Sequence, residues 1–208
     1  MLDIRLRPLK DQLFDPVCAY IPSSIKPLHV TVLAFVCGLS ACICAVNGLV
    51  VPSVLFWTLN RAFDCLDGAL ARYRKTASEL GGFLDLLCDF IVYAVLPIAV
   101  ASGQKGAEGA YRAVSILEAT VFINNFILFY IAAVAEKKAS TETKDQVKTK
   151  QLTSLVMRPA LIEGTESAVL FTAMLAFPRQ IKSLSLTMAG LVSIGIVQRT
   201  YWTIQVLK

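Results

Sequence analysis

Four aspartates lie close together in a chain that is otherwise strongly apolar: Asp64, Asp67, Asp85 and Asp89. The first two are three residues apart and the last two are four apart, so each pair falls on one face of a helix. Two such helices facing each other would gather the four carboxylates in one pocket, where like charges repel unless cations bind between them. Oxygen ligands are preferred by hard divalent ions such as Mg²⁺, Mn²⁺ and Ca²⁺. The spacing therefore predicts a divalent-metal site.

The residues between the two pairs suggest what this site binds. Arg72 supplies a fixed positive charge suited to a phosphate group. Gly68 and Gly81 either let membrane helices approach closely or leave room for a ligand beside the carboxylates. The simplest interpretation is a metal site that holds a phosphate-containing substrate. The alternative is that the aspartates are paired structural groups or solvated helix ends. Four of them argue against it, because each costs about 2.5–3.5 kcal/mol at the centre of a span and less near its end.

The elements that must position these residues are membrane helices. Hydrophobic residues make up 56% of the 208 residues and charged residues 17%, and the mean hydropathy is +0.63. Six apolar stretches approach the roughly 20 residues that cross a bilayer as a helix. They cover about 30–51, 54–73, 79–100, 111–135, 166–177 and 184–207. We therefore expect an all-α, polytopic membrane protein with six transmembrane helices, and a very short connection at residues 51–53 between the first two.

The N-terminal residues have a different pattern. Residues 1–28 intersperse basic with apolar side chains, which is typical of an amphipathic juxtamembrane helix lying along a membrane surface. They lack the uninterrupted apolar core of a cleavable signal peptide. We expect this segment to precede a single membrane domain over residues 29–208.

The distribution of lysine and arginine predicts the orientation. The N-terminal segment, the 72–75 link, the 137–158 stretch and Lys208 would lie on one, more basic side of the membrane. By the positive-inside rule that side is the cytoplasm, so both termini and the carboxylate pocket are expected there. The basic residues cluster at membrane borders instead of along one soluble face, which disfavours nucleic acid as a partner.

Other polar residues leave more than one interpretation open. Glu163 and Glu166 stand at the start of the fifth span, either as a helix start or as a contact for an acceptor headgroup. Arg158 is either an acceptor-phosphate ligand or an ordinary positive-inside residue. Asn124 and Asn125 are expected to form hydrogen bonds between helices.

The histidine and cysteine content disfavours other site types. A single histidine, His29, makes a Ser-His-Asp triad or a histidine zinc site hard to build, and we expect it at the start of a span. The six cysteines have no zinc-ribbon spacing and are expected to be small packing residues.

The stretch from Asp64 to Asp89 resembles the signature of the CDP-alcohol phosphatidyltransferases, Asp-x2-Asp-Gly-x2-Ala-Arg-x8-Gly-x3-Asp-x3-Asp. All eight fixed positions are present: Asp64, Asp67, Gly68, Ala71, Arg72, Gly81, Asp85 and Asp89. The six-span layout also resembles this family. Residues 27–31 are similar to the family's usual Pro-Asn-x-x-Thr before the first span, although Leu28 stands at the asparagine position.

The resemblance implies a reaction in which a hydroxyl attacks the β-phosphate of a CDP-linked lipid and releases CMP. It also implies that the four aspartates bind two Mg²⁺ or Mn²⁺ ions, with Asp89 as the general base as well. The same resemblance implies that the CDP pocket is lined by Gly68, Ala71, Arg72 and Gly81. A homodimer is implied in the same way.

Several functions remain open at this point. The short chain is similar to family members that transfer a phosphatidyl group from CDP-diacylglycerol to a small polyol, such as glycerol 3-phosphate, inositol or inositol phosphate. Transfer of phosphocholine or phosphoethanolamine from a CDP-alcohol to diacylglycerol is the second candidate. Intramembrane prenyltransferases also use Mg²⁺ and aspartates, but they lack the Gly-x2-Ala-Arg link. A carboxylate-lined cation transporter is the alternative outside enzymes.

Overall fold

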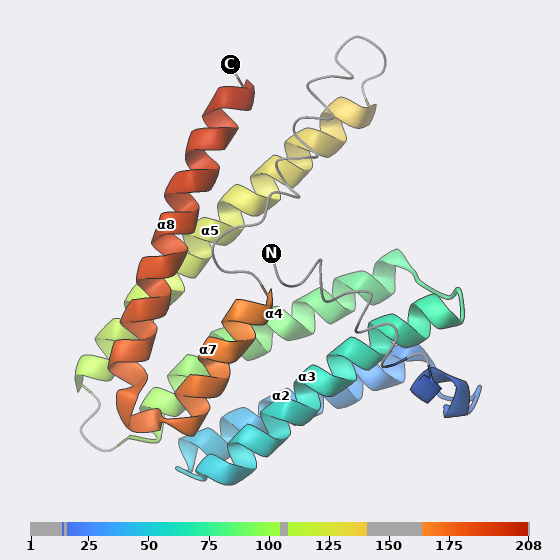
Figure 1. Cartoon of the computed structure of the whole chain (residues 1–208), viewed down its shortest axis with the longest axis horizontal. Helices are drawn as coiled ribbons and strands as arrows, with labels where there is room; N and C mark the ends of the chain where they lie inside the picture. The colour runs from blue at the N-terminus through green and yellow to red at the C-terminus, as the bar shows by residue number, and fades with distance from the viewer. Residues whose placement is uncertain (1–13, 15, 105–107, 141–163, 208) are drawn as a thin grey trace.

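The computed structural model describes residues 14, 16–104, 108–140 and 164–207, and these residues are all-α, as expected (Figure 1). The helices in chain order are α2 (Pro27–Val46), α3 (Val50–Tyr73), α4 (Glu79–Ser102), α5 (Glu108–Ser140), α7 (Gly164–Ala176), the 3₁₀ helix η1 (Pro178–Gln180) and α8 (Ile181–Leu207). Most of the predicted amphipathic segment, along with Arg158 and Glu163, lies outside the described residues.

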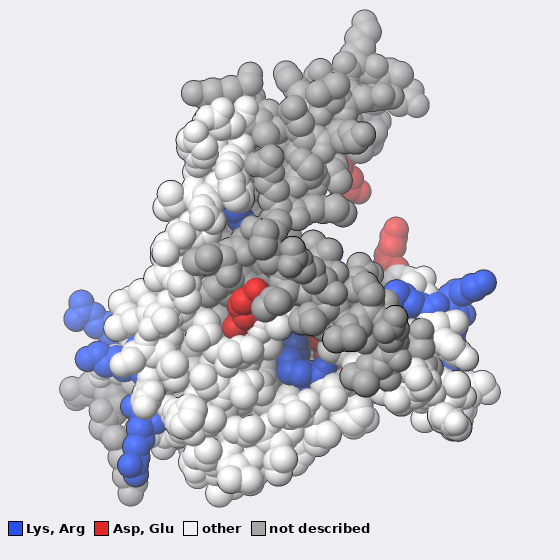
Figure 2. Space-filling model, viewed as in Figure 1, with Lys and Arg blue, Asp and Glu red and all other residues white. Residues whose placement is uncertain are grey.

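Four helices of the described residues are long and apolar enough to cross a membrane: Pro27–Val46, Glu79–Ser102, Gly109–Val134 and Pro178–Gln205. This supports a membrane protein, while the prediction of six spans is not shown. Two of the predicted spans account for the difference. Helix α3 has 24 residues but carries two aspartates and two arginines, and α7 has only 13 residues. Figure 2 shows lysine and arginine side chains gathered toward two sides of the visible surface, with mostly uncharged residues and a few charged groups between them.

The connection between the first two helices differs from the prediction. We expected it at residues 51–53, but the turn lies at Asn47–Leu49 and α3 already begins at Val50. Pro52 therefore falls in the first turn of α3, where a proline is tolerated because the N–H groups there have no partner within the helix. The proline marks a helix start, and not the loop itself.

Helix α2 packs against both α3 and α4. At Gly38 the three helices lie close together. A methyl group added at Gly38 would lie 2.7 Å from the Val92 side chain and 3.0 Å from the Asn60 amide nitrogen. That amide donates a 2.8 Å hydrogen bond to the carbonyl of Ala34. These contacts fix α3 and α4 relative to α2.

A second group of helices completes the molecule. Helices α5 and α8 pack side by side, and α7 packs against α3, α4 and α8 (Figure 1). The buried core joins both groups through apolar side chains such as Leu96, Leu117, Met174 and Met188. The apolar ends of α3 and α4 thus pack in this core, and the ends that carry the four aspartates lie outside it.

The link between α3 and α4 is closed by a cap at each helix end. Lys75, two residues after the last residue of α3, has φ 55°, in the left-handed region. The amide of Thr76 donates to the carbonyl of Ala71 at 2.9 Å. This is the pattern of a helix C-cap that usually holds glycine. Helix α4 then begins with Ser78, whose hydroxyl accepts from the amide of Gly81 at 3.1 Å. The two caps fix the position of Arg72 relative to Gly81.

Candidate active site

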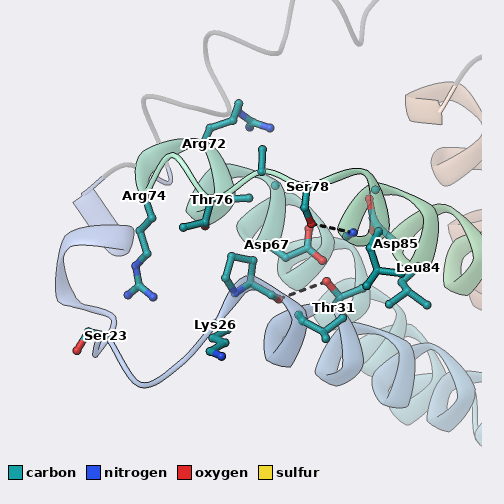
Figure 3. A pocket seen from close by; sticks show the side chains of 18 residues that line it. Ser23, Lys26, Thr31, Asp67, Arg72, Arg74, Thr76, Ser78, Leu84 and Asp85 are labelled. Carbon is teal, nitrogen blue, oxygen red and sulfur yellow. Dashed lines mark hydrogen bonds between the residues drawn. The ribbon is translucent and has the colours of Figure 1, made fainter.

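A cavity of about 630 Å³ lies where α3 ends and α4 begins. It is lined by six of the eight residues of the predicted signature: Asp67, Gly68, Ala71, Arg72, Gly81 and Asp85. Figure 3 shows Asp67 and Asp85 near Thr31 on one side of this pocket. The residues that we expected to form the CDP pocket therefore do line one common cavity with two of the carboxylates.

The opposite wall of the cavity was not anticipated from the sequence. It is formed by the elbow, residues 21–26, which contributes Ser23 and Lys26, and by Arg74 (Figure 3). The Arg74 guanidinium donates hydrogen bonds to the carbonyls of Ile25 at 2.5 Å and Ile21 at 2.7 Å. Arg74 therefore ties the chain before α2 to the end of α3. The sequence signal was only a basic residue in a link, which does not reveal a partner about 50 positions earlier.

Asp67 is the most buried of the four carboxylates, with 4% of its surface exposed. It lines the cavity together with Thr31 of α2. Its second carboxylate oxygen, Oδ2, is buried and has no hydrogen-bond partner among the described residues. Because a buried unpartnered charge is costly, this oxygen suits a cation as its ligand.

The carboxyl groups of Asp64 and Asp85 lie close enough to interact with each other. Two ionised carboxylates this close repel, which favours a proton or a cation between them. The acidic faces of α3 and α4 therefore approach each other here. Together with the Asp67 oxygen, the pair supplies oxygen donors of the kind that a hard divalent ion prefers.

The position of Asp89 differs from the prediction that all four aspartates share one pocket. It does not line the cavity, and both of its oxygens are engaged by Arg61, at 2.5 Å for Oδ1 and 3.2 Å for Oδ2. Arg61 also lies 3.5 Å from Asp64. In the described part of the chain, no three acidic, histidine or cysteine side chains converge closely enough to surround one ion.

Arg61 is held on several sides. Its Nε donates to Asn60 at 2.8 Å and its Nη1 to the Tyr93 hydroxyl at 2.5 Å. The guanidinium carbon lies 4.8 Å from the Trp57 ring centre and 5.0 Å from that of Tyr93, distances at which cation–π attraction operates. Sequence reasoning missed this role. The available signal was an arginine in a span, four residues after a tryptophan and three before an aspartate.

A second cavity, of about 500 Å³, lies among α4, α5, α7 and α8. Its lining is mostly apolar, with five polar exceptions: Glu118, Asn124, Asn125, Ser167 and Arg199. Arg199 is buried, with 7% exposed, and its Nη1 donates to Asn124 at 3.0 Å. This bond confirms the interhelical role expected of Asn124. Tyr93 lines the cavity as well, and its hydroxyl accepts a hydrogen bond from Arg61.

The remaining candidates have ordinary positions. His29 accepts a hydrogen bond from the Lys26 amide at 3.3 Å at the start of α2, as expected of a helix start. None of the six cysteines, all of which the structure describes, is in a disulfide, in agreement with a packing role. Glu166 lies in the first turn of α7.

Comparison with known proteins agrees with this site. The family model of the CDP-alcohol phosphatidyltransferases matches residues 25–195, which include the whole stretch 64–89. Inner membrane protein YnjF of Escherichia coli (strain K12) is 32% identical over 182 residues, covering 86% of this chain and 83% of that protein. No solved structure matches the chain significantly.

Proposed function

The chain belongs to the CDP-alcohol phosphatidyltransferase family, and we propose that it transfers a phosphatidyl group from CDP-diacylglycerol to a small polar alcohol, releasing CMP. The observation that carries this proposal is the shared cavity. It combines a buried, unpartnered carboxylate oxygen of Asp67 with the guanidinium-bearing Arg72 and the space beside two glycines.

The donor would bind in the cavity between α3, α4 and the elbow. Arg72 and Lys26 supply positive charge for the pyrophosphate. A side chain at Gly68 would lie 3.1 Å from the Arg72 guanidinium, so the glycine leaves space beside that group for a phosphate. The CDP-binding role of Gly68, Ala71, Arg72 and Gly81 is thus supported by their common position.

The metal ligands in this proposal are Asp64, Asp67, Asp85 and Asp89, which would hold two Mg²⁺ or Mn²⁺ ions. When bound, such ions neutralise charge on the pyrophosphate oxygens and on the leaving CMP. The fit rests on the Asp67 oxygen and on the Asp64–Asp85 contact.

Asp89 acts in this proposal as the general base. The acceptor hydroxyl oxygen forms a bond to the β-phosphorus, the bond from that phosphorus to the CMP oxygen breaks, and the hydroxyl proton moves to Asp89. Arg61 holds the receiving carboxylate by both oxygens. A base held this way keeps one orientation toward the acceptor.

The second cavity is the proposed acceptor site. Its buried Arg199 and the amides of Asn124 and Asn125 suit a small molecule with an anionic group and hydroxyls. Glycerol 3-phosphate and inositol phosphate have this chemistry, and inositol has the hydroxyls alone. Its wall at Tyr93 is one hydrogen bond away from Arg61, which holds Asp89.

For the membrane arrangement, we propose six spans, with α3 and α7 crossing beside the four apolar helices. Both termini and the donor cavity would face the cytoplasm, following the positive-inside bias. The similarity to an inner membrane protein supports a location in the inner membrane. Assembly as a homodimer is part of this proposal through family membership alone.

The test is CMP release from CDP-diacylglycerol by the purified protein, with Mg²⁺ or Mn²⁺ and a panel of polyol acceptors. Metal-dependent release with one acceptor, lost in Asp89→Asn, would support the reaction and identify the product. Release only from CDP-choline or CDP-ethanolamine with diacylglycerol would replace it by the second candidate. Metal flux in vesicles, without turnover of any CDP-linked donor, would favour a transporter instead.

A further inference from the structure

Arg61 neutralises charge inside the carboxylate cluster. Its guanidinium pairs with both oxygens of Asp89 and lies 3.5 Å from Asp64, with only 19% of the Arg61 side chain exposed. In a partly buried place, a positive charge at these distances offsets much of the repulsion between neighbouring carboxylates. The cluster therefore already contains one of the cations that its charge requires.

The same oxygens are those that a divalent ion would use. A planar guanidinium that binds a carboxylate through two parallel hydrogen bonds engages both oxygens. An ion that coordinates Asp89 must share these oxygens with Arg61 or replace it, and it is repelled by the guanidinium charge in either case. Charge repulsion also acts on an ion bound at Asp64, which Arg61 contacts.

Arg61 is not free to swing aside without loss. The rings of Trp57 and Tyr93 lie close to its guanidinium, and Asn60 accepts from its Nε. Trp57 is fixed in turn by a 2.8 Å hydrogen bond from its ring nitrogen to Thr172 of α7. The surroundings thus favour an arginine that stays next to Asp89.

We propose that Arg61 is a resident counter-ion of the carboxylate cluster, a positioning residue that holds Asp89 and competes with a divalent ion for it. Arg61 thereby lowers the affinity of the donor-free protein for the ion. Tight binding then needs the additional phosphate oxygens of the donor, which are common ligands for Mg²⁺ at such sites. This inference rests on the proposed metal-dependent function.

The experiment measures Mn²⁺ affinity of the purified full-length protein in detergent, without donor, by electron paramagnetic resonance. Three variants separate charge from geometry: Arg61→Gln keeps hydrogen-bond donors without charge, Arg61→Lys keeps charge without the planar fork, and Arg61→Met keeps neither. We expect Arg61→Gln and Arg61→Met to bind Mn²⁺ about tenfold more tightly than wild type. Arg61→Lys should stay within about threefold of wild type, because the charge remains.

Thermal unfolding supplies a second readout. Arg61→Met should unfold at a lower temperature than wild type in EDTA, and Mn²⁺ should remove most of that difference, because the ion replaces the lost charge. Arg179→Met is the control, since Arg179 lies in η1 and does not line the cavity. Any change in its stability should be the same with EDTA and with Mn²⁺, and its Mn²⁺ affinity should equal that of wild type.

Unchanged or weaker Mn²⁺ binding in Arg61→Gln and Arg61→Met would overturn the counter-ion role and leave the proposed function intact. If Arg61→Met does not fold, the Arg61→Gln and Arg61→Lys variants still test the counter-ion role. Absence of Mn²⁺ binding in wild type and all variants, with or without donor, would overturn both the counter-ion role and the metal-dependent function.

Discussion

Thr31 of α2 and Asp67 of α3 both line the proposed donor cavity. Both residues are buried, with 6% and 4% exposed. The Thr31 hydroxyl donates to the carbonyl of Pro27 at 3.3 Å, within the first turn of α2. The start of the first span and a carboxylate proposed as a metal ligand therefore belong to one site.

Replacing Thr31 by valine should weaken both stability and ion binding. The substitution keeps the shape but breaks the hydrogen bond to the Pro27 carbonyl, which contributes about 0.5–1.5 kcal/mol. It also removes a hydroxyl from the cavity lining that contains Asp67. Thermal unfolding in EDTA and a Mn²⁺ titration measure the two effects. Thr31→Ser keeps the hydroxyl and should behave like wild type, and equal losses in both variants would contradict the role of the hydrogen bond.

Asp67→Asn should separate stability from activity. The amide removes a buried charge whose Oδ2 has no described partner, so the free energy of unfolding in EDTA should stay equal or rise. CMP release should fall by roughly a hundredfold or more because a proposed metal ligand is lost. A clear loss of stability in EDTA would instead indicate that the carboxylate has a structural role.

Arg72→Met should raise the KM for the CDP-linked donor about tenfold or more, since a charged hydrogen bond to phosphate contributes about 1.5–3 kcal/mol. Steady-state CMP release over a range of donor concentrations measures this effect. Arg179→Met is the control, because Arg179 lies in η1, away from the cavity lining. An unchanged donor KM in Arg72→Met would contradict the proposed role of this arginine in donor binding.

Lys75→Gly should stabilise the protein by roughly 1 kcal/mol. Lys75 has φ 55°, a conformation that costs a residue with a Cβ about 1–2 kcal/mol and costs glycine little. The midpoint of thermal unfolding should rise in Lys75→Gly and not in Lys75→Ala, which removes the charge and keeps the strain. A lower midpoint for Lys75→Gly would show that the lysine side chain itself stabilises the link.

Local spacing accounts for what the sequence could predict. The positions from Asp64 to Asp85 are close enough in the chain that helical periodicity and one tight link bring Asp67, Arg72 and Asp85 to one cavity. The length of the apolar stretches likewise predicted where the helices begin and end, to within a few residues. Both signals depend on near neighbours.

Long-range partners account for what the sequence could not predict. Arg61 meets Asp89 across 28 positions, and Arg74 meets the carbonyl of Ile21 across 53. Periodicity is the same whether these arginines face lipid headgroups, water or a carboxylate. The separation of Asp89 from the cavity follows from the first of these contacts, so it became visible only with the fold.

Arg74 recognises the elbow through main-chain carbonyls and not through side chains. The wall of the cavity is therefore specified by the path of the backbone, and the exposed side chain of Ile25, 38% accessible, can be exchanged without disturbing that path. A fluorescent or spin label at residue 25 would be attached to this wall. Its signal in single turnovers would test whether the proposed donor reaches the elbow, from a position outside the cavity lining.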